Sequence, residues 1–306
     1  MAKKNVWTTE NIPDQSGKIV IVTGANSGIG FETVRALALH GATVIMACRS
    51  LEKGQAAVDQ IRGENPRGQV FLQRLDLADL DSVGQFAEIF LADNRRLDIL
   101  INNAGVMATP YQRTADGFEL QFATNHLGHF KLTGLLIDLL KSTPNSRVVT
   151  VTSYGHLFGR INFNDLNSQR FYQKWLAYCQ SKLANVLFGY ELQRSLKNSG
   201  DNPISIVAHP GSVATNLQRT TTLFRMLNPI IAQSPELGAL STLYAATSPE
   251  IHGGEFIGPD GFLAQRGYPH KARSSPRSHD PELARRLWEV SEELTQVQYG
   301  LSSLTE

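Results

Sequence analysis

The chain has 306 residues, and no repeat, low-complexity tract or long linker marks a boundary, so we expect a single domain with a large core. Its 29 basic and 28 acidic residues are spread along the sequence with a net charge of +1, which gives no electrostatic basis for binding nucleic acid. Two cysteines without metal-ligand spacing, and no apolar stretch near the roughly 20 residues of a membrane span, predict a cytoplasmic protein with no metal centre.

The first predicted strand, residues 18–23 (KIVIVT), is a short apolar run that ends at a glycine-containing turn, and a helical pattern follows over residues 31–40. Glycines between a strand and a helix let the backbone approach a pyrophosphate, whose charge the helix N-terminus stabilises. The spacing G-x-x-x-G-x-G differs from the usual G-x-G-x-x-G, and an ordinary turn capped by Ser27 is the alternative. The residues expected to hold a dinucleotide here are Gly24, Asn26, Ser27, Gly28, Ile29 and Gly30.

Residues 42–47 (ATVIMA) predict a second strand, which ends near Arg49. An acidic residue at this place would hold the ribose hydroxyls of NAD. A guanidinium can instead pair with the 2'-phosphate of NADP through charge-assisted hydrogen bonds worth about 1.5–3 kcal/mol. Arg49 therefore favours NADP(H) as the cofactor, with a solvated arginine at a strand end as the alternative.

Strands and helices continue to alternate along the chain. Helical patterns cover residues 50–62, 79–93, 114–141, 175–195 and 281–294, and strands are expected at residues 69–74, 97–101, 147–152, 204–208 and 256–262. This order predicts an α/β fold, a single-domain Rossmann structure with a doubly wound, seven-stranded parallel sheet and helices on both faces. Within residues 1–306, a C-terminal extension is expected at about residues 263–306.

Polar residues follow several strands at their carboxyl ends, where open α/β sheets bind ligands. Asp76 could meet an adenine amino group or cap the next helix. Asn125 interrupts an apolar helix, which is unfavourable unless its amide has a partner. Ser153 ends the fifth strand with a hydroxyl. The other candidates at this edge are Leu77, Asn103, Ala104, Gly105, Pro210, Gly211, Val213 and Thr215, of which the Asn103–Gly105 stretch could equally be a plain turn.

Tyr178 and Lys182 lie four residues apart in the helix predicted over residues 175–195, so they share one face. A neighbouring ammonium favours the phenolate and is expected to lower the pKa of the phenol. Such a tyrosine is a general acid or base, and with Ser153 it could enclose a carbonyl oxygen. The alternative is a surface tyrosine stacked over a lysine.

Taken together, these residues resemble the short-chain dehydrogenase/reductase family over nearly the whole chain. The matching set is T-G-x-x-x-G-x-G from Thr23, N-N-A-G from Asn102, Asn125, Ser153, Y-x-x-x-K from Tyr178, and Pro210-Gly211. Residues 124–130 (TNHLGHF) are most similar to the branch of retinol dehydrogenases and light-dependent protochlorophyllide reductases. Residues 163–166 (FNDL) and the 25-residue gap between Ser153 and Tyr178 add to the similarity to the retinol dehydrogenases. The N-terminal membrane anchor of animal retinol dehydrogenases has no match.

The resemblance implies four catalytic residues. Tyr178 would exchange a proton with the substrate oxygen, and Ser153 would donate a hydrogen bond to that oxygen. Lys182 would hold the nicotinamide ribose and keep the phenol acidic, so both Tyr178 and Lys182 would also contact the cofactor. Asn125 would hold a water that links Lys182 to solvent. The family often forms dimers or tetramers, which allows a homo-oligomer here.

The resemblance implies that the region after Pro210, at about residues 212–235, is a substrate lid. This region is strongly apolar and includes Leu217 and Phe224, which suggests a lipophilic alcohol, ketone or aldehyde such as a retinoid. A dimer face or a core helix would explain the same pattern. Tyr154, His156 and Phe158 could line the same pocket. The expected function is an NADP(H)-dependent oxidoreductase, a retinol dehydrogenase-like carbonyl reductase. A protochlorophyllide-type photoreductase and a non-catalytic NADP-binding regulatory protein are the alternatives.

Overall fold

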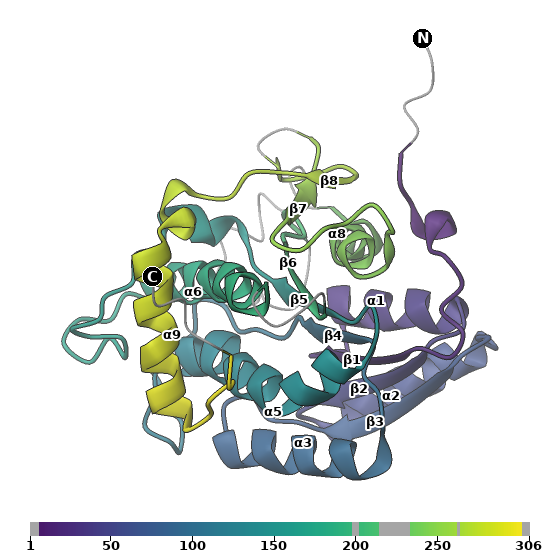
Figure 1. The fold of residues 1–306 in the computed structure, drawn as a ribbon, viewed down its shortest axis with the longest axis horizontal. Helices are drawn as coiled ribbons and strands as arrows, with labels where there is room; N and C mark the ends of the chain where they lie inside the picture. The colour runs from purple at the N-terminus through teal and green to yellow at the C-terminus, as the bar shows by residue number, and fades with distance from the viewer. Residues whose placement is uncertain (1–5, 198–201, 214–232, 262–263, 302–306) are drawn as a thin grey trace.

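A twisted sheet runs through the middle of the molecule, with helices on both faces (Figure 1). The computed structural model describes residues 6–197, 202–213, 233–261 and 264–301. In these ranges the sheet has eight strands in the order β3-β2-β1-β4-β5-β6-β7-β8. The strands are β1 (Ile19–Thr23), β2 (Thr43–Cys48), β3 (Gln69–Arg74), β4 (Ile99–Asn102), β5 (Arg147–Val151), β6 (Ile204–Ala208), β7 (Phe256–Pro259) and β8 (Pro269–Lys271).

Strands β1 to β7 are parallel, as expected, and the chain winds outward in both directions from β1. This confirms the doubly wound Rossmann arrangement. The expected number of seven strands is wrong by one, because β8 pairs antiparallel with β7 through three residues. This strand begins with a proline and is too short to show an apolar pattern of its own. It forms because β7 presents a free edge with which it can pair.

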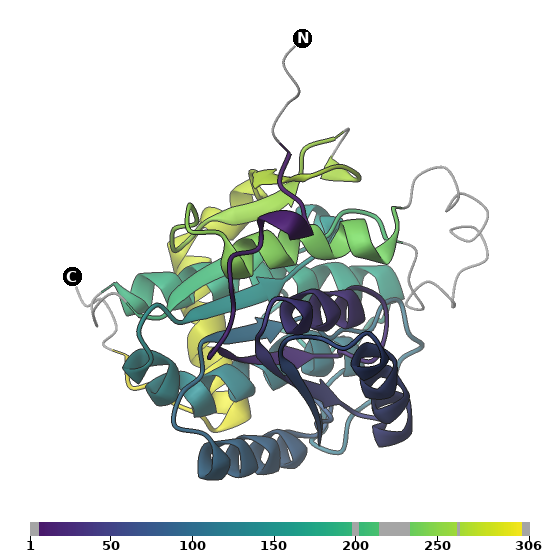
Figure 2. The ribbon, with the colours of Figure 1, turned by 90° about the vertical axis from the view of Figure 1, so that its right-hand side faces the viewer.

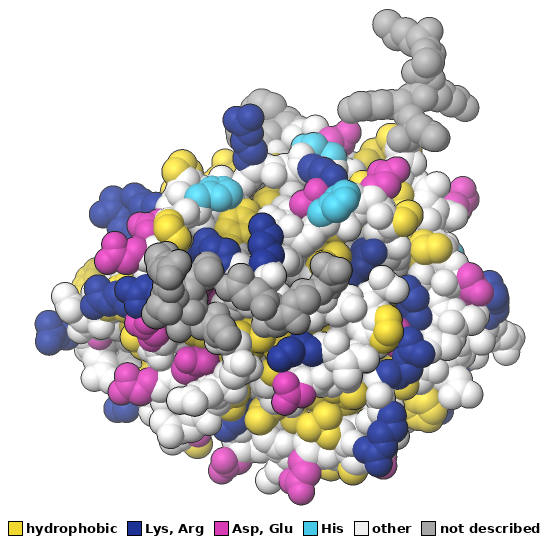
Figure 3. Space-filling model, viewed as in Figure 1, with side chains coloured by type: hydrophobic (Ala, Val, Ile, Leu, Met, Phe, Trp, Pro, Cys, Tyr) yellow, Lys and Arg dark blue, Asp and Glu magenta, His cyan; other side chains and the backbone are white. Residues whose placement is uncertain are grey.

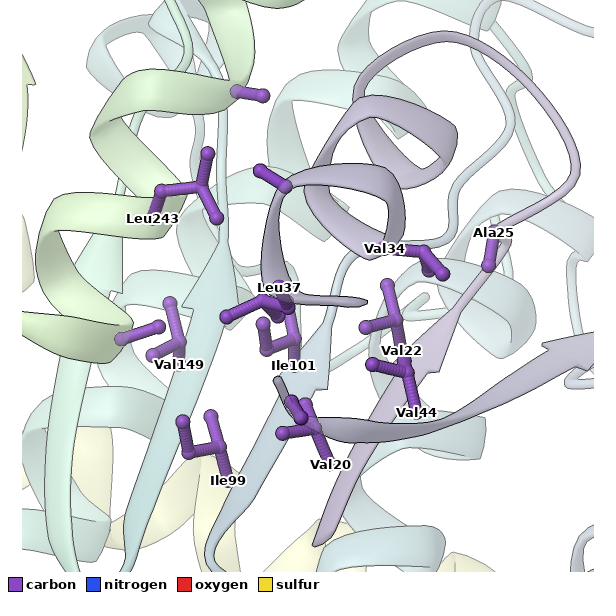
Figure 4. Close-up of a cluster of buried hydrophobic side chains, with 14 of the residues drawn as sticks. Val20, Val22, Ala25, Val34, Leu37, Val44, Ile99, Ile101, Val149 and Leu243 are labelled. Carbon is purple, nitrogen blue, oxygen red and sulfur yellow. The ribbon is translucent and has the colours of Figure 1, made fainter. Parts of the chain in front are cut away.

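Alternate residues of each strand enter two separate cores, because successive side chains of a strand point to opposite faces. Val20, Val22 and Val44 pack with α1 (Gly28–Leu39) and α8 (Pro235–Thr247), and this core is shown in close-up in Figure 4. Ile21 and Ile45 point the other way, toward α3 (Leu80–Asp93) and α5 (Gly128–Ser142). The other helices of the described ranges are α2 (Leu51–Gly63), α4 (Leu120–Phe122), α6 (Lys174–Leu196) and α9 (Pro281–Thr295).

The single long helix expected over residues 114–141 is interrupted. Its first turn is the short α4, a π-helical turn follows at Ala123–Leu127, and α5 then begins at Gly128. Residues 114–119 lie outside any helix. Asn125 lies within the π-helical turn, so the residue that marked the anomaly in the sequence also marks the break.

The C-terminal extension is an integral part of the fold. After β8 it forms the 3-10 turn η6 (Pro276–His279) and then α9, which begins at the N-cap Asp280 and packs along α6 and α5 (Figures 1 and 2). Trp288 and Tyr299 pack here against Phe130 of α5 and Phe188 of α6, with ring centroids 4.4–6.4 Å apart. Burial of aromatic rings in such contacts makes α9 a stable cover for the two helices.

Basic and acidic side chains are intermingled on the face seen in Figure 3. Of the helices in the described ranges, none is both long enough and apolar enough to span a lipid bilayer.

Candidate active site

The carboxyl ends of β1, β4, β5 and β6 are neighbours in the sheet, and most of the candidate residues follow these four strands. Parallel pairing aligns Val151 of β5 with Ala208 of β6, and Asn102 of β4 with Thr150 of β5. The strand order reverses between β1 and β4, and the carboxyl edge at such a reversal is the usual ligand position in open α/β sheets. The fold therefore brings the candidate residues to one place.

The turn between β1 and α1 can be formed only by glycines at its critical positions. Gly24 and Gly28 have φ values of +65° and +56°. A Cβ on Gly30 would lie 2.4 Å from the carbonyl oxygen of Gly24 and 2.6 Å from Asn103 Nδ2. Ser27 occupies the N-cap position of α1 but makes no cap hydrogen bond with its side chain. The helix N-terminus thus keeps donors available for an anion, and the residues present fit a dinucleotide phosphate.

Thr23 connects the end of β4 to the glycine turn through hydrogen bonds. Its Oγ1 accepts hydrogen bonds from the backbone N–H groups of Asn103 at 2.9 Å and Ala104 at 3.0 Å. Asn103 Nδ2 also donates to the carbonyl of Thr23 at 2.8 Å. His129 continues the network, with Nε2 2.9 Å from Thr23 Oγ1 and Nδ1 3.0 Å from the carbonyl oxygen of Asn125. Sequence reasoning gave Thr23 and His129 no such role.

Two candidates for the adenosine half follow β2 and β3. Arg49 is exposed directly after β2. Asp76 accepts a hydrogen bond from Ala78 N at 3.0 Å, and its side chain does not cap the next helix. Asp79 is the N-cap of α3, so the capping alternative for Asp76 is wrong. Leu77 is buried, and its carbonyl oxygen would lie 2.4 Å from a Cβ on Gly128.

Ser153 and Tyr178 lie together at the edge of the sheet. Ser153 follows β5 as the N-cap of the 3-10 turn η3 (Tyr154–Phe158), and its Oγ accepts from Gly155 N at 3.0 Å. Tyr178 comes from α6 and is 9% exposed, and its hydroxyl interacts with the side chain of Ser153. A Cβ on Gly155 would lie 3.1 Å from both Ser153 Oγ and the Tyr178 ring. Two hydroxyl groups therefore face the same small space.

Lys182 lies beneath this pair, one turn further along α6. Its Nζ is 5.9 Å from the centre of the Tyr178 ring and 3.4 Å from the carbonyl oxygen of Val151. A Cβ on Gly105 would lie 3.3 Å from the same nitrogen. The ammonium group thus lies between the loop after β4 and the body of α6, close to both Tyr178 and Gly105.

The pKa of the phenol differs from the expectation. Burial raises the pKa of Tyr178 to about 12, although the hydrogen bond with Ser153 acts in the opposite direction. Burial also lowers the pKa of Lys182 to about 8. The expected lowering of the tyrosine pKa by the ammonium is therefore wrong for this structure, because desolvation of the ring outweighs the attraction of a cation that is itself desolvated.

Asn125 uses its side-chain amide to connect the loop after β4 with α6. Oδ1 accepts from Val106 N at 2.8 Å, and Nδ2 donates to the carbonyl of Val106 at 3.0 Å and to Ser181 Oγ at 2.9 Å. Ser181 in turn donates to the carbonyl of Tyr178 at 2.8 Å. Both amide hydrogens are thus committed to the scaffold. Ser181 was missed in the sequence, although it lies within the motif that begins at Tyr178.

The loop after β6 has a defined start. Gln233 Nε2 donates to the carbonyl of Pro210 at 2.7 Å, and Val213 forms an isolated bridge with Gln233. Gly211 has φ +75°, and a Cβ there would lie 2.5 Å from the carbonyl oxygen of Gln265. Of the expected lid, residues 214–232 lie outside the described ranges, and with them Thr215, Leu217 and Phe224.

The three candidate pocket residues after Ser153 differ in exposure. Phe158 is 63% exposed, Tyr154 is partly exposed, and His156 is 3% exposed. Both ring nitrogens of His156 have backbone partners. Within the described ranges, His, Cys, Asp and Glu side chains form no group of three that could hold a metal ion.

The comparisons with known proteins agree with this geometry. Residues 18–225 match the family model described as short chain dehydrogenase. Retinol dehydrogenase 11 of Mus musculus is 45% identical over 281 residues, which cover 90% of this chain and 85% of the relative. Retinol dehydrogenase 13 of Homo sapiens is 46% identical over 290 residues, with coverage of 91% and 84%. The solved structure of an uncharacterised protein from Mycobacterium paratuberculosis has a TM-score of 0.82 at 44% identity, and covers 97% of this chain and 100% of that chain.

The family match extends over more than half of the chain, and the identity to the retinol dehydrogenases extends over nearly all of it. The resemblance seen in the sequence is thereby confirmed, including its retinol dehydrogenase-like branch. The chain belongs to the short-chain dehydrogenase family and is an oxidoreductase of alcohol and carbonyl groups.

Proposed function

We propose that this protein is an NADP(H)-dependent oxidoreductase that interconverts a lipophilic alcohol and its aldehyde or ketone, with a retinoid as the model substrate. The observation that carries the proposal is the placement of the Tyr178 hydroxyl beside Ser153, with Lys182 beneath them, at the edge of the sheet that holds the glycine turn. The substrate class is suggested by the names of the relatives, which are retinol dehydrogenases.

The chemistry follows from the protonation states. A bound nicotinamide nucleotide supplies or accepts the hydride. With a pKa of about 12, Tyr178 holds its proton at neutral pH and can donate it to a carbonyl oxygen. The Ser153 hydroxyl, whose oxygen already accepts from Gly155, is free to donate to the same oxygen. Lys182, which is only 5% exposed, provides a positive charge near the growing alkoxide and stabilises it.

The preference for NADP(H) is supported by two arginines at the ends of adjacent strands. Arg74 ends β3 and pairs in register with Cys48, the residue before Arg49. Side chains alternate along a strand, so Arg74 shares the sheet face of Leu72 and Cys48, on the side of α1 and α2. Both arginines are exposed, and no carboxylate of the described residues pairs with either. Two free guanidinium groups would favour a ribose that carries a 2'-phosphate.

The test is a panel of retinal, aromatic and aliphatic aldehydes and ketones, assayed in the dark by NADPH absorbance beside NADH at equal concentration. We expect turnover with lipophilic aldehydes and kcat/KM at least about tenfold higher with NADPH. Turnover only with light and a porphyrin pigment would instead identify a photoreductase. Tight NADPH binding without turnover on any member of the panel would identify a regulatory protein.

A cytoplasmic location and a homo-oligomeric state remain predictions. The free thiols of Cys48 and Cys179 suit a reducing compartment. Cell fractionation of the full chain tests the location, and light scattering of the purified protein tests the oligomeric state.

A further inference from the structure

His156 connects the turn that carries Ser153 to the C-terminal extension. Its Nδ1 lies 2.7 Å from the carbonyl oxygen of Ser153, and the backbone nitrogen of Ser275 lies 3.2 Å from its Nε2. A carbonyl oxygen can only accept and a backbone N–H can only donate, so the ring is neutral with its proton on Nδ1. Burial lowers the pKa of His156 and favours the same neutral form.

The hydrogen bond with His156 is one of three that hold Ser153 in place. The carbonyl of Ser153 accepts from the backbone N–H of His156 at 3.1 Å as well as from the ring. The hydroxyl oxygen of Ser153 accepts from Gly155 N. Both the peptide plane and the side-chain oxygen of Ser153 are therefore held in place beside Tyr178.

The segment Ser274–Ser278 contacts both elements that carry the catalytic hydroxyls. Arg277 Nη1 donates to the carbonyl of Gly159, the residue that ends η3, at 3.1 Å. Ser274 Oγ lies 2.7 Å from the hydroxyl of Tyr190, which belongs to α6. Ser278 Oγ donates to the carbonyl of Ser275 at 2.6 Å and holds the segment in its turn. The segment thus links η3 to α6 from outside the sheet.

We propose that His156 is a positioning residue for the reaction: with the backbone N–H of Ser275 it sets the place of Ser153 relative to Tyr178. The C-terminal extension is thereby part of the framework of the active site. This inference rests on the proposed function, because it assigns Ser153 a role in turnover. It also assigns His156 a role behind the site, through Ser153, in place of contact with the substrate.

A proline at position 275 removes the one backbone hydrogen that His156 Nε2 accepts. Ser275 has φ −63° and ψ 148°, values that suit a proline and a residue before Pro276. The matched control is Ser275→Ala, which keeps the N–H and removes a hydroxyl that has no partner among the described residues. We expect Ser275→Pro to lower kcat about two- to tenfold, with the KM for NADPH unchanged, and Ser275→Ala to leave both unchanged.

A double variant with Ser153→Ala distinguishes an effect that acts through Ser153 from a general structural effect. In a Ser153→Ala background, Ser275→Pro is expected to have no further effect on kcat, because the contact acts through the serine. His156→Phe keeps the ring against Phe256 but loses both nitrogens, and is expected to lower kcat about ten- to a hundredfold. His156→Asn restores a donor at the position of Nδ1 and is expected to recover part of that loss.

Three results would overturn the inference: an equal loss in Ser275→Ala and Ser275→Pro, a loss from Ser275→Pro that persists without Ser153, or full activity in His156→Phe. A wild-type protein inert on the whole panel would refute the proposed function instead. In that event nitrogen NMR of the histidines still decides whether the contact exists. The contact requires the Nδ1–H tautomer of His156 in the wild type. In Ser275→Pro the carbonyl of Ser153 still holds the proton on Nδ1, so the expected change is a shift of the Nε2 resonance, which loses its hydrogen bond.

Discussion

Replacement of Lys182 by methionine should make the protein more stable while it removes activity. Lys182 is fully enclosed by protein, and burial lowers its pKa from 10.5 to about 8. Each pKa unit corresponds to about 1.4 kcal/mol, so the protonated lysine destabilises the ligand-free fold by about 3 kcal/mol at pH 7. Methionine has a similar shape and no charge. The carbonyl of Val151, which loses the lysine, still accepts from Asn185 Nδ2 at 3.1 Å.

The destabilisation caused by the buried Lys182 depends on pH, and its direction follows from the two pKa values. Between pH 8 and 10.5 the unfolded chain holds the proton on Lys182 more tightly than the folded protein, so the stability of the wild type rises with pH through this window. The advantage of Lys182→Met should therefore fall from about 3 kcal/mol at pH 7 to about 1 kcal/mol at pH 10. Titration of the other groups is common to both proteins and cancels in the difference.

Urea unfolding followed by tryptophan fluorescence at pH 7 and pH 10 measures both values. Lys53→Met, at an exposed lysine of α2, is the control and should change the free energy of unfolding by less than about 0.5 kcal/mol at either pH. A destabilised Lys182→Met at pH 7, or an advantage that is the same at both pH values, would show that Lys182 is not destabilised by burial.

Three further outcomes are expected. Tyr178→Phe should lower kcat at least about a thousandfold. The Kd for NADPH, measured by the fluorescence of the nucleotide, should change less than about twofold. A variant that keeps a tenth of the activity would argue against proton transfer by this residue. Arg49→Asp should raise the KM for NADPH about ten- to a hundredfold in steady-state kinetics and leave the KM for NADH unchanged. Equal effects on the two KM values would contradict a contact with the 2'-phosphate. Gly30→Ala places a methyl group 2.4 Å from the Gly24 carbonyl oxygen and should abolish NADPH binding. Gly84→Ala, the control in α3, meets open space and should raise the free energy of unfolding by up to about 1 kcal/mol in calorimetry. Similar behaviour of the two variants would refute the packing argument.

The sequence predicts the sheet well because its parallel strands are short apolar runs separated by helices. Residues 69–74 and 204–208 were placed with the boundaries that the structure shows. Helix α8 was missed although Ser234 caps it and Pro235 begins it, because it is buried on nearly every side and has no amphipathic period. Strand β8 was missed because it is defined only by its partner.

The candidate site was predictable as a set of residues but not as a set of interactions. The break at Asn125 depends on Val106 and Ser181, which are 19 and 56 residues away in the chain. The raised pKa of Tyr178 depends on how much protein surrounds the ring, which spacing along a helix does not reveal. The role of His156 depends on a backbone N–H 119 residues away. Motif spacing fixes which groups are present, whereas the tertiary structure decides their protonation and partners.

The link between His156 and Ser275 also bears on how the protein is made. A ribosome adds Ser275 about a hundred residues after Tyr178, so the glycine turn, Ser153 and α6 all emerge before the segment that contacts His156. A nascent chain can therefore complete most of its sheet while Ser153 is still without this support. The full rate of turnover should therefore be reached only in the last stage of synthesis, when residues 274–295 dock onto α6.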